Sequence, residues 1–262
     1  MLSRMGYRPV RQFILLLIPC TLFIILLLGG TYWAIPDPTC ADNKRNQEEE
    51  EVDCGGPCIP CVLRHIQNIE LLRVRFDEVL PGVYDVVAKV KNPNTKLIAR
   101  TFPFDIHLKD DAGVIIQKHP GRSFLYAGET AYIVEAGIPA KRKITSAEFL
   151  IDNKEVQWVV GDAMNPLILI GDKSVETVRQ GDTVETRLHV TIYNQALVDF
   201  RGIEVGILAL NKKNDDIIAL NKTRVDELKA GDSASLTFSW PGSVPIDPAH
   251  LLVQPRVTFV TQ

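Results

Sequence analysis

A run of 23 uncharged residues, 13–35, constrains this chain more than any other feature of its sequence. A helix rises about 1.5 Å per residue, so roughly 20 apolar residues cross a hydrocarbon core ~30 Å thick. The run ends near Tyr32 and Trp33, whose rings favour the membrane interface. We therefore expect residues 13–35 to form a single transmembrane signal-anchor helix whose partner is the lipid bilayer.

The charges on either side predict the orientation of this helix. Residues 1–12 carry Arg4, Arg8 and Arg11 and no acidic residue, whereas residues 36–53 carry seven acidic and two basic residues. Positive flanks remain on the cytoplasmic side of a membrane. We expect a cytoplasmic segment at residues 1–12 and a C-terminal region outside the cytoplasm.

Two other interpretations of this segment are less consistent with the residues. A cleaved signal peptide has an apolar core of about 7–15 residues and a small-residue cleavage site. Here the apolar run is longer, and residues 29–34 offer a poor site. A lipoprotein modified at Cys20 is disfavoured because Pro19 stands where a small residue is needed and the apolar run continues past the cysteine.

The other four cysteines, Cys40, Cys54, Cys58 and Cys61, fall within 22 residues in the spacing C-x13-C-x3-C-x2-C. An even number of cysteines outside the cytoplasm indicates two disulfides, and three pairings are open. Tetrahedral zinc coordination is the alternative, although an oxidising compartment disfavours it. A redox-active Cys58-x-x-Cys61 lacks the helix N-terminus that lowers a thiol pKa. We predict disulfides and no metal or cofactor.

The residues between these cysteines carry a resemblance. Asp42, Asn46, Glu49 and the run from Asp53 through Cys54-Gly-Gly-Pro-Cys-x-x-Cys resemble a short cysteine-rich module of bacterial surface and secreted proteins, C-x-D-G-x-x-N-x-x-E-x-x-x-D-C-G-G-x-C-x-x-C. The chain has Asn43 where glycine is usual, and asparagine tolerates positive φ better than most residues. The resemblance implies an exported protein. The carboxylates are also of the type that calcium takes, but a solvated acidic stalk at 36–61 is the interpretation we favour.

Beyond the stalk, short apolar runs alternate with turn signals, which predicts a mainly β region of antiparallel sandwiches. The region also repeats itself. Residues 86–94 match 188–196, residues 103–118 match 203–220, and residues 126–130 match 229–233, with offsets of 102 at Asn92 and 103 at Gly128. Such a period predicts two tandem domains, at 62–161 and 162–262.

The order of strand, Asn92-Pro-Asn94 turn, strand, hairpin and Gly128-Glu-Thr turn resembles immunoglobulin-like domains of membrane-anchored bacterial proteins. It also resembles, more distantly, the LEA14-like β-sandwich. This resemblance implies two tandem antiparallel immunoglobulin-like sandwiches, which would follow the transmembrane helix and the short cysteine-rich stalk predicted above. Domains of this kind serve many purposes, so the resemblance does not fix a function.

The sequence contains no motif of a known catalytic site. Its histidines lie outside metal-ligand spacing, and its acidic pairs, 110–111 and 215–216, fall at predicted hairpin tips. We expect Trp158 and Trp240 to fill cores. A net charge of −3 provides no basic excess for nucleic acid.

These features predict a non-enzymatic, membrane-anchored binding or scaffold protein of the cell envelope, with possible protein partners there. The alternatives are an accessory subunit of a secretion, pilus or transport complex and, third, an enzyme with an unrecognised site.

Overall fold

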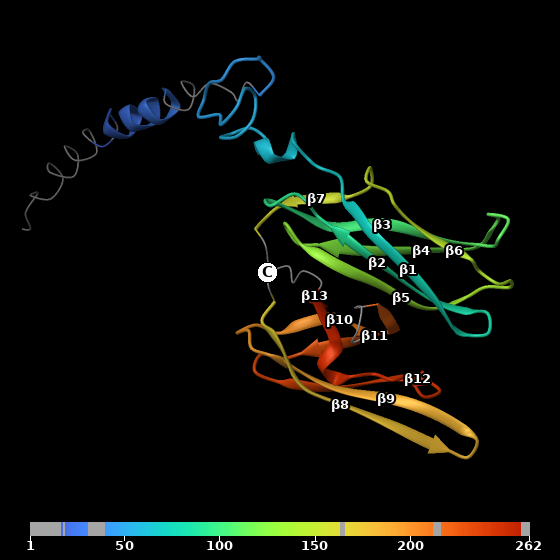
Figure 1. The fold of residues 1–262 in the computed structure, drawn as a ribbon. Helices are drawn as coiled ribbons and strands as arrows, with labels where there is room; N and C mark the ends of the chain where they lie inside the picture. The colour runs from blue at the N-terminus through green and yellow to red at the C-terminus, as the bar shows by residue number, and fades with distance from the viewer. Residues whose placement is uncertain (1–16, 18, 31–39, 163–165, 212–215, 258–262) are drawn as a thin grey trace, which may run out of the picture. The chain divides into compact units, whose positions relative to one another are not determined.

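The structure is a computed structural model that describes residues 17, 19–30, 40–162, 166–211 and 216–257 (Figure 1). The chain divides into two compact units, Met1–Cys61 and Val62–Gln262. The described part of the second unit is built from antiparallel strands, with short 3-10 turns at η1 (Cys61–Leu63), which begins at the unit boundary, and η2 (Pro248–His250). The prediction of a mainly β protein with sandwich-like sheets is therefore confirmed.

Within the first unit, residues 17 and 19–30 are helical and exposed. Thr21 Oγ1 donates to the Leu17 carbonyl at 2.9 Å, so the one hydroxyl of this stretch is satisfied by the helix backbone. Among the described residues, no helix has both the length and the apolar character needed to span a membrane. Residues 13–16, 18 and 31–35 of the predicted anchor lie outside the described residues.

The first half of the second unit consists of two sheets. One has the strand order β1-β2-β5, and the other has the order β4-β3-β6, with β7 also paired to β3. All of these pairings are antiparallel. The strands are β1 (Glu70–Leu80), β2 (Val83–Lys91), β3 (Leu97–Lys109), β4 (Ile115–Leu125), β5 (Thr130–Pro139), β6 (Ser146–Ile151) and β7 (Gln157–Val160).

The second half has the same plan, with sheets of order β12-β9-β8 and β11-β10-β13. The segments matched by sequence take equivalent places, because β2 and β9 are each the central strand of a three-stranded sheet. The strands are β8 (Ile168–Gln180), β9 (Thr183–Asn194), β10 (Phe200–Leu210), β11 (Ile217–Leu228), β12 (Ser233–Pro241) and β13 (Leu251–Val257).

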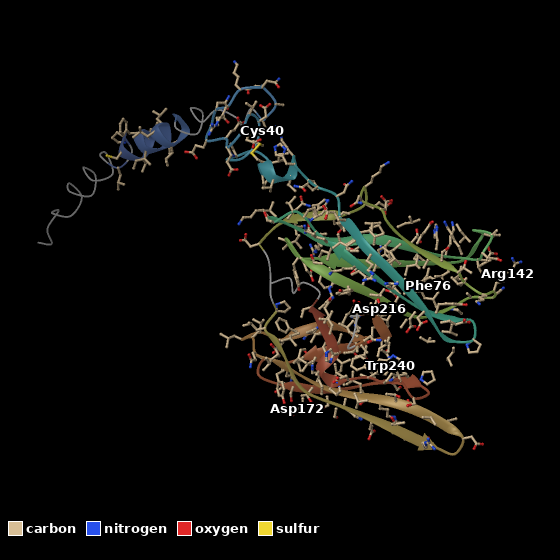
Figure 2. All side chains as sticks on the ribbon, in the orientation of Figure 1. Cys40, Phe76, Arg142, Asp172, Asp216 and Trp240 are labelled. Atoms are coloured by element: carbon tan, nitrogen blue, oxygen red, sulfur yellow. A yellow bond between two sulfur atoms is a disulfide. The ribbon has the colours of Figure 1, made fainter. Side chains whose placement is uncertain are left out.

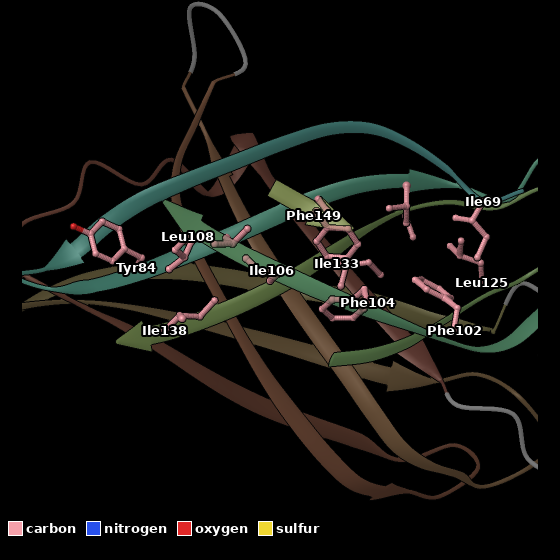
Figure 3. Packing of buried hydrophobic residues seen from close by; sticks show 14 of the residues in the cluster. Ile69, Tyr84, Phe102, Phe104, Ile106, Leu108, Leu125, Ile133, Ile138 and Phe149 are labelled. Carbon is pink, nitrogen blue, oxygen red and sulfur yellow. The ribbon is translucent and has the colours of Figure 1, made fainter. Parts of the chain in front are cut away.

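Each pair of sheets encloses its own hydrophobic core. Alternate residues of a strand face one side of its sheet, and the buried members of β9 follow this period of two. In β2 residues 84–88 are all buried, because Val86 and Ala88 face the first core while Val87 faces the second half. In the first core, Phe104 and Phe149 stack with ring centroids 4.5 Å apart (Figure 3). Trp240 is buried in the second core and donates from Nε1 to the Leu220 carbonyl at 2.6 Å. Trp158 packs against the first core while remaining partly exposed.

Two buried asparagines, Asn92 and Asn194, show how closely the halves correspond. The side-chain amide of each donates to two carbonyls, and its oxygen accepts from the backbone N–H two residues later. The partners are Leu97 O, Tyr126 O and Asn94 N for Asn92 (2.7, 2.9 and 3.0 Å) and Val198 O, Leu228 O and Ala196 N for Asn194 (2.9, 3.0 and 3.0 Å). The matched asparagines therefore fix the same turn in both halves.

Candidate functional site

The cysteine module contains two disulfides, Cys40–Cys58 and Cys54–Cys61. The sulfur of Cys40 is visible in Figure 2. Cys58 and Cys61 belong to different disulfides, so the C-x-x-C pair does not form a redox disulfide. Glu51, Cys54 and Cys61 place their ligand atoms within 4.8 Å of one another. Zinc binds cysteine as the thiolate, and the two sulfurs of this group are bonded to each other.

Two buried carboxylates hold the module's turns together. Asp53 Oδ1 accepts from the backbone N–H groups of Asp42 and Asn43 at 3.0 and 3.1 Å. Glu49 Oε2 accepts from the N–H groups of Asn46 and Asp53 at 3.2 and 3.1 Å. A carboxylate that accepts backbone N–H groups replaces the water lost on burial. These two carboxylates are therefore buried and bind the module's own backbone, in contrast to the solvated acidic stretch that we expected.

The backbone of the module requires glycine at two positions. Gly55 and Gly56 have φ of 81° and 56°, and a Cβ on either would lie within 3 Å of the module's own atoms. Asn43, which stands in place of the usual glycine, has φ of 58°. Asparagine accommodates this left-handed conformation. Asn43 therefore takes a backbone conformation to which glycine is also suited.

A second candidate site is the junction in the second unit where its two halves meet. Four buried apolar residues, Val87 and Val134 from the first half and Leu208 and Leu220 from the second, form a third hydrophobic cluster. Because these side chains come from the outer faces of β2, β5, β10 and β11, the two halves pack sheet against sheet. Apolar burial of this kind resists separation of the halves.

Arg256, on β13, clamps this junction. It is 5% exposed, and its guanidinium lies 4.2 Å from the centroid of the Phe124 ring. Nη1 donates to Ser123 Oγ at 3.0 Å, and Nη2 donates to the Phe124 carbonyl. Nε has no hydrogen-bond partner among the described residues and lies 3.6 Å from Glu129 Oε1, longer than a hydrogen bond. A planar, multi-donor cation suits such a site better than lysine does.

Further hydrogen bonds cross the same junction. Gln254 accepts from the N–H of Tyr132 at 3.0 Å and donates to its carbonyl at 3.1 Å. Tyr126 Oη donates to the Val257 carbonyl at 2.6 Å. Burial, and then the nearby Glu129 carboxylate, raise the pKa of Tyr126 to about 12, although Arg256 opposes them. The phenol therefore stays protonated and keeps donating across the physiological range.

A cavity of about 250 Å³ opens at one end of the junction, between β1, β2 and β11. Arg75 bonds across it at 3.3 Å to Asp216, which is labelled in Figure 2. Asp85 is buried and accepts from the Gly137 N–H at 2.8 Å. Burial raises the pKa of Asp85, and the Asp77 carboxylate on the paired strand raises it further, while the Gly137 hydrogen bond lowers it. The cavity thus holds a carboxyl group whose charged form is disfavoured.

The remaining polar residues singled out by sequence are spread over several elements. Asp110 accepts from the Ala112 and Val114 N–H groups at 3.1 and 2.9 Å, the turn chemistry that was predicted. Asp215 lies outside the described residues, whereas Asp216 joins the junction. Three histidines each face a carboxylate, the pairs being His119–Glu135, His189–Glu176 and His250–Asp247. The first two pairs join neighbouring strands, whereas Asp247 is the N-cap of the 3-10 turn that contains His250. Sequence reasoning missed Arg256, because only the packing of the two halves brings its partners together. It also missed Asp85, whose neighbours Asp77 and Gly137 come from the two strands that flank β2.

No protein-family model matches the chain, and no curated protein matches it. Among solved structures it is similar to red sea bream transglutaminase, with 14% identity and a TM-score of 0.25 over 74% of this chain and 30% of that chain. It is also similar to the N-terminal CBM22-1–CBM22-2 tandem domain of Xyn10C from Paenibacillus barcinonensis, with 9% identity and a TM-score of 0.15 over 72% and 82% of the two chains. The chain therefore spans under a third of the transglutaminase. Similarities this weak carry no argument about function.

Proposed function

We propose that this is a membrane-anchored, extracytoplasmic protein of the cell envelope that binds or scaffolds other components and has no enzymatic activity. Residues 1–12 are cytoplasmic, residues 13–35 form the single-pass anchor, and residues 36–61 form the stalk. Residues 62–161 and 162–262 form two tandem immunoglobulin-like sandwiches. The observation that carries this proposal is the buried junction that fastens the two halves of the second unit together.

A scaffold must hold its surfaces in a fixed relation, and the junction supplies this property. The two guanidinium hydrogen bonds of Arg256 and the two side-chain hydrogen bonds of Gln254 all cross the junction. Lys222 Nζ of the second half bonds to Glu135 Oε2 of the first at 2.7 Å. Hydrogen bonds in fixed directions, added to an apolar contact, favour one arrangement over many. The two halves therefore act as a single body.

The stalk supports the proposed compartment. Disulfides persist in oxidising environments and are rare in the cytoplasm. The described module has two of them, and only Cys20 is free among the described cysteines. The helical residues 19–30 support the anchor, because apolar side chains such as Leu26 and Leu28 are 67% and 65% exposed in the isolated chain. An apolar surface of this kind requires a cover.

Labelling of the module in intact cells tests the topology. After mild reduction of intact cells that carry the Cys20→Ala variant, a membrane-impermeant thiol reagent should modify the four cysteines of the module. The Cys20→Ala variant without reduction is the matched control and should remain unmodified, because its four module cysteines are in disulfides. Modification that occurs only after lysis would refute the proposed orientation.

A subunit role in a larger envelope complex is the second candidate, and the edge strand β8 favours it. In the described part of the chain, this 13-residue strand pairs only with β9. A free strand edge can accept a strand of a partner. Purification from mild detergent separates the candidates, because a stoichiometric partner set indicates a subunit, whereas exchangeable partners indicate a binding protein.

A further inference from the structure

Five large apolar side chains gather on the surface of the second half, at the start of β8 and around the turn after β9. Leu197 is 98% exposed, and the others range from 36% to 58%. We refer to them as the apolar tip: Leu167, Leu169, Tyr193, Leu197 and Val198. They are neighbours, because Leu169 pairs with Tyr193 across the sheet and the Gln195 N–H donates to the Leu167 carbonyl at 2.8 Å. Clustered exposed apolar residues mark a surface that contacts something.

The first half of the same unit provides an internal comparison for two of these positions. Leu169 and Tyr193 are paired next to the buried Asn194, and Glu70 and Lys91 are paired in the same way next to Asn92. The backbone plan is shared, but the polar pair of the first half has become an apolar pair in the second. The fold alone therefore does not require apolar residues there.

The turn shows the same replacement. The amide of Asn92 donates to the Leu97 carbonyl, and that of Asn194 donates to the Val198 carbonyl. This equivalence makes Leu197 the counterpart, in the second half, of Lys96 in the first half. Lys96 forms an exposed ion pair with Asp162. The first half therefore has a solvated lysine where the second half has a fully exposed leucine. This difference between the two surfaces indicates a functional role for the apolar one.

The apolar tip lies at the end of the unit where the chain from the stalk enters. Gln67 follows Cys61 by six residues, and its N–H and carbonyl both bond to the Asn94 side chain, at 2.9 and 2.7 Å. The turn at Asn94 is joined in turn to Glu129, whose carbonyl accepts from the Asn92 N–H. The asparagine turn of the first half, which contains both Asn92 and Asn94, is therefore at the entry end.

The second half reaches the same end. A cavity of about 310 Å³ is lined by Tyr126 and Glu129 of the first half and by Ile168 and Ile170 of the second. Ile168 pairs directly with Asn194. The asparagine turn of the second half, which carries the tip, therefore lies beside that of the first.

We propose that the apolar tip inserts into the outer leaflet of the bilayer that holds the anchor, an inference that rests on the proposed anchor at residues 13–35. Only the 26 residues of the stalk and five more, 62–66, separate that anchor from Gln67 at the unit's entry end. The tip carries leucine, valine and tyrosine and no charge of its own, which suits the boundary between headgroups and acyl chains. A tether raises the effective concentration of the tip at the surface, so a small apolar contact is sufficient.

The test uses the full chain reconstituted in phosphatidylcholine vesicles. In a Cys20→Ala background, Leu197→Cys is labelled with a nitroxide while the module cysteines remain in disulfides. The matched controls are Lys96→Cys, at the equivalent turn, and Asp182→Cys, in the hairpin between β8 and β9. We expect membrane-dissolved oxygen to relax the label at 197 more than a water-soluble nickel chelate does, and the reverse at 96 and 182. Val198→Cys is a second probe of the same tip.

The outcomes separate this proposal from the anchor on which it rests. If the protein does not float with the vesicles, the anchor is wrong and the tip proposal falls with it. If it floats and the label at 197 is as accessible to nickel as the label at 182, the anchor stands and the tip proposal is overturned. A label at 197 shielded from both reagents indicates a protein contact, including a second copy of the chain, and also overturns it.

Discussion

The buried asparagine turn yields a prediction whose magnitude follows from its contacts. Replacing Asn92 by alanine removes the partners of two buried carbonyls, on Leu97 and Tyr126, and of the Asn94 N–H. Asn92 is 0% exposed, so water cannot reach these groups without a change in structure. The substitution therefore removes three buried hydrogen bonds without returning their groups to solvent, although the Tyr126 carbonyl still accepts from the Glu129 N–H at 3.2 Å.

Each such hydrogen bond contributes a net ~1 kcal/mol, and an orphaned buried group costs about 1–3 kcal/mol. We therefore expect Asn92→Ala to lower the free energy of unfolding by about 3 kcal/mol or more. For a unit of this size, 1 kcal/mol corresponds to roughly 2–4 °C, so Tm should fall by about 6–12 °C. Asn194→Ala should have a similar effect, because Asn194 is 1% exposed and has the corresponding three partners.

Guanidinium unfolding of the full chain in detergent micelles, followed by near-ultraviolet circular dichroism, measures this free energy. Asn68→Ala is the matched control, since Asn68 is exposed and its loss should change stability by no more than about 0.5 kcal/mol. Asn92→Asp should be at least as damaging as alanine, because a carboxylate cannot donate to the two carbonyls. A loss below about 1 kcal/mol for Asn92→Ala would refute the argument, since the loss of these three hydrogen bonds would then have been compensated.

Three further predictions concern the cavity, the junction and the module. Asp85→Asn keeps an acceptor for the Gly137 N–H but removes the titratable carboxyl group. Because burial raises the Asp85 pKa, the free energy of unfolding of the wild type should rise as the pH falls through that pKa towards 3.8. Denaturation curves of the variant, measured over the same pH range, should lack this rise. Arg256→Met should lower the free energy of unfolding by about 2 kcal/mol or more, and Arg256→Lys should not restore it, because lysine lacks the fork. Reduction should abolish amide protection in residues 40–61 but not in β2 or β9, as measured by hydrogen exchange.

The repeat could be predicted from sequence because it rests on local requirements. Asn92 and Asn194 each follow a strand whose alternate residues face a core, and each is followed about 35 residues later by a glycine turn, at Gly128 and Gly231. Only an amide can donate twice and accept at such a corner. The same residue types are therefore required at matched positions in both halves. The nearly equal offsets of the asparagine pair and the glycine pair reveal the repeat in the sequence.

The disulfide pairing and the junction could not be predicted, because they depend on contacts between distant segments. The spacing of Cys40, Cys54, Cys58 and Cys61 allows three pairings, and the turns closed by Glu49 and Asp53 select one. In the sequence, Arg256 is one arginine in a short strand. Its partners, at Ser123 and Phe124, lie more than 130 residues earlier and come from a different sheet.

The two halves also differ in a way that bears on function. Their turns keep the same buried asparagine, yet the residues around it diverge from Glu70 and Lys91 to Leu169 and Tyr193. Interior hydrogen bonds are retained because losing them destabilises the fold, whereas surface residues change at little cost to stability. Where a repeat preserves its corner and replaces its surface, the replaced surface is the part free to serve a task of its own. The apolar tip is such a surface, and the clamp at Arg256 fixes its position relative to the end where the tether enters.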